Sequence, residues 1–154
     1  MTEKFKVETK LGVFECAVEG EAISEIKFLK SKQSSPAPKG AFQKEVARQL
    51  KAYASGKLKD FCLPVVVRGT DFTLKVLHEL WALDYGEQIS YRDLANRAGR
   101  PKAVRAVASV MARNRLPIIL PCHRIVASNG SLGGYTGGLG MKRSLIQLEQ
   151  RKKA

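Results

Sequence analysis

The spacing of the hydrophobic residues changes near residue 65, and this change constrains the fold more than any other feature. Over residues 1–30, apolar and polar residues alternate in the runs "FKVET", "GVFECAVEG" and "AISEIKFLK". Alternation with a period of two predicts a small antiparallel sheet. After residue 65, the apolar residues recur mostly at helical spacing. We therefore expect an α+β protein with a small α/β domain over residues 1–65 and a mostly helical domain over 66–154.

Between the sheet and residue 65, one helix is expected. The stretch "SKQSSPAPKG" (31–40) has the composition of a loop. The stretch "AFQKEVARQLKAYASG" (41–56) places apolar residues on one helical face and ends at a glycine that suits a helix terminus. These apolar residues are Phe42, Val46, Leu50 and Tyr53. The stretch "FCLPVVVRG" (61–69) is interpreted as a short strand or a connector.

The second half of the chain has the pattern of a helix-turn-helix motif. After a helix within "TDFTLKVLHELWAL", Ser90 and Asp93 predict the capped start of a short helix that closes at Gly99. Pro101 suits the first turn of the next helix, "PKAVRAVASVMARN". Two short helices separated by a glycine-containing turn are typical of a helix-turn-helix.

The second of these helices presents two different faces. An apolar stripe suited to the core consists of Val104, Val107 and Met111. Another face, at spacings i, i+3, i+4 and i+7, consists of Arg105, Ala108, Ser109 and Ala112. The small residues would let a groove wall come close to the helix. Alanine is also simply a good helix former, so this signal is weak by itself.

The positive charge is concentrated in the second half of the chain. The net charge is +13, and residues 91–154 hold 13 Lys and Arg against only Asp93 and Glu149. This asymmetry favours a polyanionic partner, most simply nucleic acid. No apolar run approaches the ~20 residues of a membrane helix, and the charged start "MTEKFKVE" lacks a signal-peptide core. We therefore expect a soluble protein of the cytoplasm, or of the nucleus in a eukaryote.

The cysteine and histidine residues do not have the spacing of a metal site. The three cysteines are Cys16, Cys62 and Cys122, without a CxxC pair, and the two histidines are His78 and His123. This pattern argues against a disulfide framework, a zinc site and a thioredoxin-type motif. Neither a metal nor another cofactor is expected. Cys16 and Cys62 are interpreted as small buried hydrophobic residues.

The stretch "LPIILPCHRIVASNG" (116–130) resembles a buried strand but carries a thiol, an imidazole and a guanidinium at its centre. Burying a charge is costly unless it is paired. His123 and Arg124 could lower the pKa of the Cys122 thiol. However, neighbours in an extended segment point to opposite faces, so adjacency does not bring the imidazole to the sulfur. The residues alone leave open whether Cys122 is reactive or an inert core cysteine.

The motif "PCHRIV" resembles the active-site signature of the O6-alkylguanine-DNA alkyltransferases, also called methylated-DNA–protein-cysteine methyltransferases. The resemblance covers most of residues 66–150. It includes "GTDF", "YGEQISY", "GRPKAVRAV", "GGYTGG", "LIQLE" and Asn114, eight residues before the cysteine. The first 65 residues are similar only in layout to the family's ribonuclease H-like N-terminal domain. For the second half, the resemblance implies a winged-helix-like alkyltransferase domain with the helix-turn-helix.

The resemblance implies that Cys122 accepts the alkyl group from O6-alkylguanine in double-stranded DNA. His123 would take the thiol proton through a water molecule, and Glu149 would orient the imidazole. Asn114 would tie the helix-turn-helix to the active-site segment. Tyr91 would turn the target nucleotide and donate a proton toward the leaving guanine. Because water does not cleave the thioether product, each molecule would act once.

The resemblance also implies a DNA-binding face and a base pocket. Arg105 would fill the stack after the base has left it, while Ala108 and Ser109 would allow approach from the minor groove. Phosphate contacts are expected from Lys102, Arg113 and Arg115. Tyr135, Thr136, Gly137 and Met111 are expected to line the base pocket. We expect Arg124 to be structural and the protein to be a monomer, with cooperative assembly on DNA and activity on O4-alkylthymine left open.

Two other classes of function also account for part of the sequence. A helix-turn-helix regulator would explain the basic half but not the combination of Cys122, His123 and Glu149. A cysteine hydrolase would explain the thiol but neither Arg105 nor the charge. A mass spectrum after mixing with O6-methylguanine DNA separates the three. A stable gain of one methyl indicates the transferase, an unchanged mass the regulator, and turnover the hydrolase.

Overall fold

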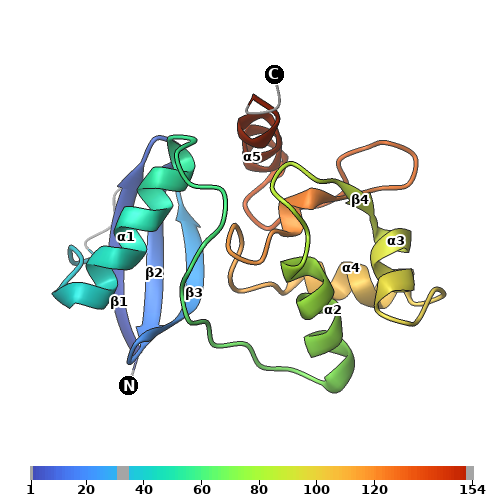
Figure 1. Ribbon diagram of the computed structural model, residues 1–154, viewed down its shortest axis with the longest axis horizontal. Coiled ribbons are helices and arrows are strands. Elements are labelled where there is room, and N and C mark those ends of the chain that lie inside the picture. The colour runs from blue at the N-terminus through green and yellow to red at the C-terminus, as the bar shows by residue number, and fades with distance from the viewer. Residues whose placement is uncertain (1, 31–34, 152–154) are drawn as a thin grey trace. The chain divides into compact units, whose positions relative to one another are not determined.

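The computed structural model describes residues 2–30 and 35–151, and the chain divides into two compact units, Met1–Val67 and Arg68–Ala154. The expected loop over 31–40 falls partly outside the described residues, at 31–34. The first unit is a sheet with one helix and the second is mostly helical (Figure 1). The α+β fold predicted from the change of hydrophobic period is therefore confirmed.

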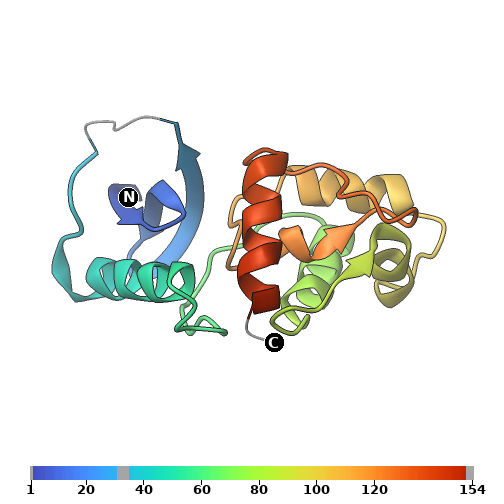
Figure 2. The ribbon, with the colours of Figure 1, turned by 90° about the horizontal axis from the view of Figure 1, so that it is seen from above.

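The first unit is built on an antiparallel sheet in the order β1-β2-β3. The strands are β1 (Thr2–Thr9), β2 (Gly12–Glu19) and β3 (Ala22–Leu29), as the alternating pattern predicts. Helix α1 (Gly40–Ala54) lies along one face of this sheet (Figure 2). Val46, Leu50 and Tyr53 of α1 are buried. The apolar face of the helix therefore closes the small core of this unit, while Phe42 at its start is only half-buried.

The segment after α1 is a connector rather than a strand. Its only bridge within the described residues joins Val65 to Ile23 of β3. Nearby, the Gln49 side chain donates to the Cys62 carbonyl at 3.1 Å and accepts from its N–H at 2.9 Å. Cys62 itself is exposed, so the prediction of a buried hydrophobic cysteine is wrong there. Gln49 holds the Cys62 backbone against α1 and leaves the thiol outside the core.

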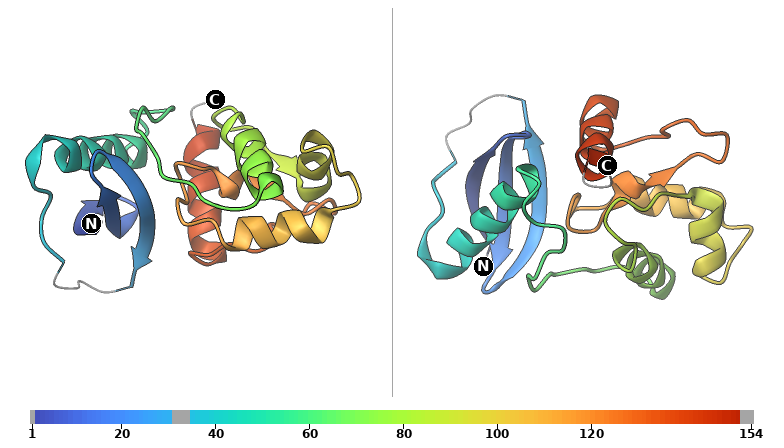
Figure 3. Two further views of the ribbon diagram at one scale, coloured as in Figure 1. Left: turned by 90° about the horizontal axis from the view of Figure 1, so that it is seen from below. Right: turned by 45° about the horizontal axis from the view of Figure 1, so that its top comes forward.

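The second unit packs three helices together beside a short parallel sheet. Helices α2 (Asp71–Trp81), α3 (Tyr91–Arg97) and α4 (Val104–Ala112) contact one another (Figure 3). Strand β4 (Ile89–Ser90) pairs with β5 (Ile125–Val126), and α5 (Leu139–Arg151) ends the described chain. Their shared core includes Val76, Leu80, Leu94, Val107 and Leu145. Among the described residues, no helix is long and apolar enough to cross a membrane.

The helix-turn-helix expected at residues 90–114 is present as two helices joined by a turn. The predicted capping box at the start of α3 is confirmed, because the Ser90 side chain accepts from the Asp93 N–H at 3.0 Å and the Asp93 carboxylate accepts from Ser90 N–H. The prediction that Pro101 begins the next helix is wrong. A hydrogen bond from Ala103 N–H to the Arg100 carbonyl closes a turn with Pro101 inside it, and α4 begins at Val104. The fixed φ of proline suits such a turn as well as a first helical turn.

The stretch around Cys122 is not a strand. Cys122–Arg124 form a single turn of 3-10 helix (η1), and only the following two residues are extended, in β5. The turn is closed by a hydrogen bond from the Arg124 N–H to the Pro121 carbonyl at 2.9 Å. The extended interpretation is therefore wrong, because a continuous apolar run does not distinguish a strand from a buried turn. This turn changes the directions in which the thiol, the imidazole and the guanidinium point.

Candidate active site

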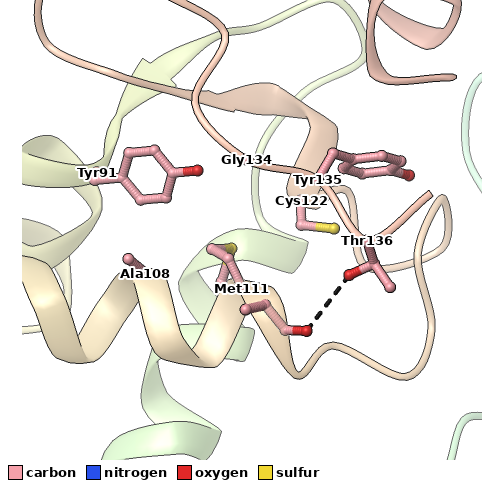
Figure 4. A pocket seen from close by; sticks show the side chains of 8 residues that line it. Tyr91, Ala108, Met111, Cys122, Gly134, Tyr135 and Thr136 are labelled. Carbon is pink, nitrogen blue, oxygen red and sulfur yellow. Dashed lines mark hydrogen bonds between the residues drawn. The ribbon is translucent and has the colours of Figure 1, made fainter. Parts of the chain in front are cut away.

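Cys122 lies in the wall of a pocket of about 300 Å³ in the second unit. The pocket is lined by Tyr91, Ala108, Met111, Ala112, Cys122, Gly134, Tyr135 and Thr136. Figure 4 shows Tyr91 on one side, with its hydroxyl toward the cavity, and Tyr135 and Thr136 on the other. Five of the predicted site residues, Tyr91, Met111, Cys122, Tyr135 and Thr136, thus come together. Gly137 does not line the pocket, and Ala108 of the predicted DNA-binding face does.

Asn114 joins the end of α4 to the segment that leads to Cys122. Its side-chain amide donates to the Leu120 carbonyl at 2.9 Å, and its side-chain oxygen accepts from the Leu116 N–H at 3.0 Å. Residues 116–121 are buried, so their backbone groups need internal partners. Asn114 supplies two of these partners, in agreement with the linking role that the family resemblance implies.

The Cys122 thiol is protonated at neutral pH. Burial raises its pKa to about 11, although a hydrogen bond from Asn114 and the charge of Lys142 act in the opposite direction. A thiol with such a pKa is a poor nucleophile, because the thiolate is the reactive form. A nucleophilic role for Cys122 therefore requires a nearby base.

His123, the next residue in the chain, is the candidate for that base. Its imidazole is completely buried, and Nε2 lies 2.6 Å from the Oε2 atom of Glu149. Burial holds the pKa of His123 below its usual value, so the ring is neutral. With Glu149 accepting from Nε2–H, the basic nitrogen of the neutral ring is Nδ1. Glu149 thus selects the tautomer of His123 that can accept a proton.

Glu149 is ionised because several donors surround its carboxylate. Arg124 donates to Oε1 at 2.9 Å and to Oε2 at 3.1 Å, and the Gly86 N–H donates to Oε1 at 2.9 Å. Burial alone would raise the pKa of Glu149, but the hydrogen bonds and charges of His123 and Arg124 hold it well below the usual range. Arg124 also donates to the Leu83 carbonyl at 2.8 Å. These contacts support the structural role expected for Arg124.

Tyr91 begins α3 and contacts the loop that forms the other side of the pocket. Burial raises the pKa of its hydroxyl, while a hydrogen bond with the Gly134 backbone lowers it; the net effect is an increase. Tyr91 therefore carries its proton at neutral pH. Gly133 approaches the ring so closely that an added Cβ would lie 2.8 Å from the Tyr91 hydroxyl oxygen.

The predicted DNA-contacting residues lie on α4 and at its two ends. Arg105 and Ala108 are exposed on α4, and Ser109 is half-buried. The expected phosphate-binding residues Lys102, Arg113 and Arg115 are all exposed. The face that includes Arg105 and Ala108 therefore adjoins the pocket, because Ala108 and Ala112 belong to both.

Sequence reasoning missed Gly134, which lines the pocket, and Lys142 of α5, whose charge acts on the Cys122 thiol. The Lys142 side chain is completely buried, and its ammonium group donates to the carbonyl oxygens of Ile125, Leu132 and Gly134. One signal was available: with Leu145 and Glu149, Lys142 occupies positions i, i+3 and i+7 on the buried face of α5. A lysine on such a face needs internal hydrogen-bond partners.

Comparisons with known proteins find similar sequences and a similar fold. The family model described as "6-O-methylguanine DNA methyltransferase, DNA binding domain" matches residues 71–151. A methylated-DNA–protein-cysteine methyltransferase of Methanosarcina barkeri is 39% identical over 149 residues, which cover 94% of each chain. One of Mycobacterium tuberculosis is 36% identical over 152 residues, covering 95% of this chain and 91% of the relative.

Solved structures show the same similarity. The structure of Mycobacterium tuberculosis OGT in complex with DNA has a TM-score of 0.88 and 34% identity, and the match covers 97% of this chain and 94% of that one. The Mycobacterium tuberculosis O6-methylguanine methyltransferase has a TM-score of 0.87 and 33% identity, with 98% and 94% covered. Similarity of this extent in both sequence and fold shows that the chain belongs to the methylated-DNA–protein-cysteine methyltransferase family.

Proposed function

We propose that Cys122 is the residue to which this member of the family transfers the alkyl group of O6-alkylguanine in DNA, restoring guanine directly. The observation that carries the proposal is the position of Cys122 in the pocket wall. The next residue in the chain, His123, is neutral and hydrogen-bonded to Glu149. A pocket of about 300 Å³ is large enough for a small ligand such as a base.

The first step is formation of the thiolate. The Cys122 proton passes through a water molecule to Nδ1 of His123, because Nε2 is engaged by Glu149. The ring then carries a positive charge, which the Glu149 carboxylate stabilises at 2.6 Å. Arg124 keeps that carboxylate ionised and in place. General-base help of this kind contributes about 10²–10⁴-fold to a rate.

The second step is transfer of the alkyl group. The Cys122 sulfur attacks the alkyl carbon, a bond forms between them, and the bond between the alkyl carbon and O6 of the guanine breaks. The electron pair of the broken bond stays with the guanine, and Tyr91 donates a proton to the leaving base. Solvent returns a proton to Tyr91. The product is a thioether, which water does not cleave, so each molecule acts once.

The target base must leave the duplex to reach Cys122, which is only 4% exposed. Arg105 fills the vacated space in the stack, and Ala108 and Ser109 allow α4 to approach through the minor groove. Lys102, Arg113 and Arg115 contact phosphates. Support for this arrangement comes from the exposure of these basic side chains and from the pocket residues that α4 shares with this face.

The remaining parts of the proposal concern the whole chain. Residues 1–65 form a ribonuclease H-like domain, and residues 66–154 form a winged-helix-like domain that binds DNA and carries the reaction. The residues that line the pocket all belong to the second unit, which is consistent with a protein that acts as a monomer. Repair takes place where the DNA is, in the cytoplasm or, in a eukaryote, the nucleus.

Mass spectrometry tests the function directly. The protein is mixed with a duplex that contains one O6-methylguanine, and its intact mass and peptides are then measured. We expect a stable gain of one methyl group on the peptide that contains Cys122, at no more than one methyl per molecule. An unchanged mass, or DNA repaired in excess over protein, would contradict the proposal.

A further inference from the structure

Apart from the effect of its charge on the pKa of Cys122, Lys142 has no part in the proposed transfer steps, although it is among the most deeply buried charged residues. Its side chain is 0% exposed in α5. The ammonium group donates to the Ile125 carbonyl at 2.6 Å, to the Gly134 carbonyl at 3.1 Å and to the Leu132 carbonyl. An ammonium group has three donors, so these three carbonyls use all of them. A buried ammonium group that is hydrogen-bonded in this way restricts the movement of the backbone segments to which the three carbonyls belong.

The three carbonyls belong to both ends of one loop. Ile125 lies in β5, whereas Leu132 and Gly134 lie in the segment that forms the pocket wall beside Tyr91. Between these two ends, a hydrogen bond from the Ala127 N–H to the Ser131 carbonyl at 3.0 Å folds the intervening residues into a turn. Lys142 therefore ties the Leu132–Gly134 backbone to β5 and to α5.

The Leu132–Gly134 segment in turn contacts Tyr91. Gly133 has a φ of +72°, and a Cβ at this position would lie 2.8 Å from the Tyr91 hydroxyl oxygen and 2.9 Å from its ring. The Gly134 backbone is hydrogen-bonded to the hydroxyl. The Lys142 ammonium also lies 5.9 Å from the centre of the Tyr91 ring. A shift of this segment would therefore move the Tyr91 hydroxyl.

We propose that Lys142 is a positioning residue: by clamping the backbone of residues 132–134, it holds the Tyr91 hydroxyl where it donates a proton to the leaving guanine. The inference rests on the proposed role of Tyr91 as that donor. Lys142 acts through the loop and does not contact the alkyl carbon or the base. Figure 4 shows the Tyr91 hydroxyl directed toward the part of the pocket bounded by Gly134 and Cys122.

A double-mutant cycle tests the inference with the full chain. Single-turnover transfer from an O6-methylguanine duplex is measured for wild type, Lys142→Met, Tyr91→Phe and the double variant. A misplacement of about 1 Å costs roughly 10²-fold in rate, so we expect a loss of that order for Lys142→Met. In the Tyr91→Phe background, we expect Lys142→Met to slow transfer by less than about 3-fold, because residues that act as a unit are not additive.

The cycle separates the two proposals. If Tyr91→Phe slows transfer and the Lys142→Met effect is fully retained in the double variant, Lys142 does not act through Tyr91 and the inference is overturned, while the role of Tyr91 stands. If Tyr91→Phe transfers at the wild-type rate, the proposed role of Tyr91 fails and the inference fails with it. General damage to the fold by Lys142→Met would slow transfer equally with Tyr91 and with Tyr91→Phe. Such damage would therefore also show as a fully retained effect in the double variant, which overturns the inference.

A second variant disturbs the contact between Gly133 and Tyr91 without changing Lys142. Gly133→Ala adds a methyl group against the Tyr91 hydroxyl, and we expect a loss of transfer that is again largely absent in the Tyr91→Phe background. Gly140→Ala is the matched control, because a Cβ there meets nothing within 4 Å. Lys44→Met, at an exposed position of α1, controls for the loss of a positive charge. Wild-type transfer by Gly133→Ala would overturn the inference.

Discussion

The Nε2 atom of His123 lies 2.6 Å from Oε2 of Glu149, and both side chains are almost completely excluded from solvent. The two residues are 26 positions apart in the chain. Their hydrogen bond leaves Nδ1 as the basic nitrogen of the ring, and Arg124 keeps Glu149 ionised through a second buried contact at 2.9 Å. In the proposed transfer, the positive charge that His123 gains is therefore compensated by an ionised carboxylate.

His123→Ala should slow methyl transfer at neutral pH by about 10²–10⁴-fold, the usual contribution of a general base. The pKa of the Cys122 thiol is raised to about 11 by burial, so few molecules hold a thiolate without help from His123. As the pH rises toward that value, the thiol ionises unaided and the deficit should shrink. Single-turnover rates measured across a pH series check this expectation, and a deficit that is independent of pH would argue against the base role.

Cys122→Ala should abolish transfer completely, whereas Cys62→Ser should transfer at the wild-type rate. Cys62 is exposed and lies in the other unit, and burial raises the pKa of Cys16 to about 12. Both thiols therefore lie outside the unit that holds the pocket, and the Cys16 thiol is protonated at neutral pH. Peptide mapping after reaction with methylated DNA locates the methyl group. A methyl on Cys16 or Cys62 would show that the acceptor has been misassigned.

Glu149→Gln should lower the free energy of unfolding at neutral pH by about 3–5 kcal/mol, the cost of removing one partner from a buried ion pair. Folding lowers the pKa of Glu149 from 4.5, so its contribution to stability is fully present above pH 4.5 and is lost as the pH falls through the lower pKa of the folded state. Urea unfolding curves measured from neutral to acidic pH should therefore converge for wild type and variant.

The matched control for that experiment is Glu45→Gln. Glu45 also lies in a helix and pairs with Arg48, but the pair is exposed to solvent. Its loss should change the urea midpoint little at any pH. If both substitutions lowered the free energy of unfolding equally, burial of the Glu149 ion pair would not determine how much the pair contributes to stability.

Arg105→Ala should strongly slow transfer from duplex DNA and leave transfer from free O6-benzylguanine nearly unchanged. The free base is already outside a stack, so it does not need a side chain to fill the gap. A mismatch opposite the lesion lowers the cost of extrusion, typically a few kcal/mol, and should partly restore the duplex rate. Arg105→Lys should restore less than its charge suggests, because a planar guanidinium stacks and an ammonium does not.

Arg143→Ala serves as the control for Arg105, since it removes an exposed positive charge from α5, away from the pocket lining. Arg143→Ala should change the rate of transfer little for both substrates at matched ionic strength. If Arg105→Ala slows transfer from the free base and from the duplex equally, Arg105 supports the pocket or the fold. The proposed role in base extrusion would then be wrong.

Local patterns in the sequence predicted the parts of the fold that depend on near neighbours. Period-two alternation predicted the three strands, and Ser90 with Asp93 predicted the capped start of α3, because these signals involve residues that touch within one element. Pro101 was misplaced because its fixed φ suits a turn and a helix start equally. The apolar run before Cys122 was misinterpreted because a strand and a buried turn share that composition.

By itself, the sequence determined the α+β organisation, the basic second half, and, through "PCHR" and its companion motifs, the family. Only the tertiary structure decided which polar groups meet. The 3-10 turn at Cys122–Arg124 brings His123 and Arg124 to Glu149 of α5. The same helix carries Lys142, which meets three backbone carbonyls of other segments. The physical reason is that a buried charge is tolerated only where distant segments supply its partners. Those partners are set by packing between segments, which no local pattern contains.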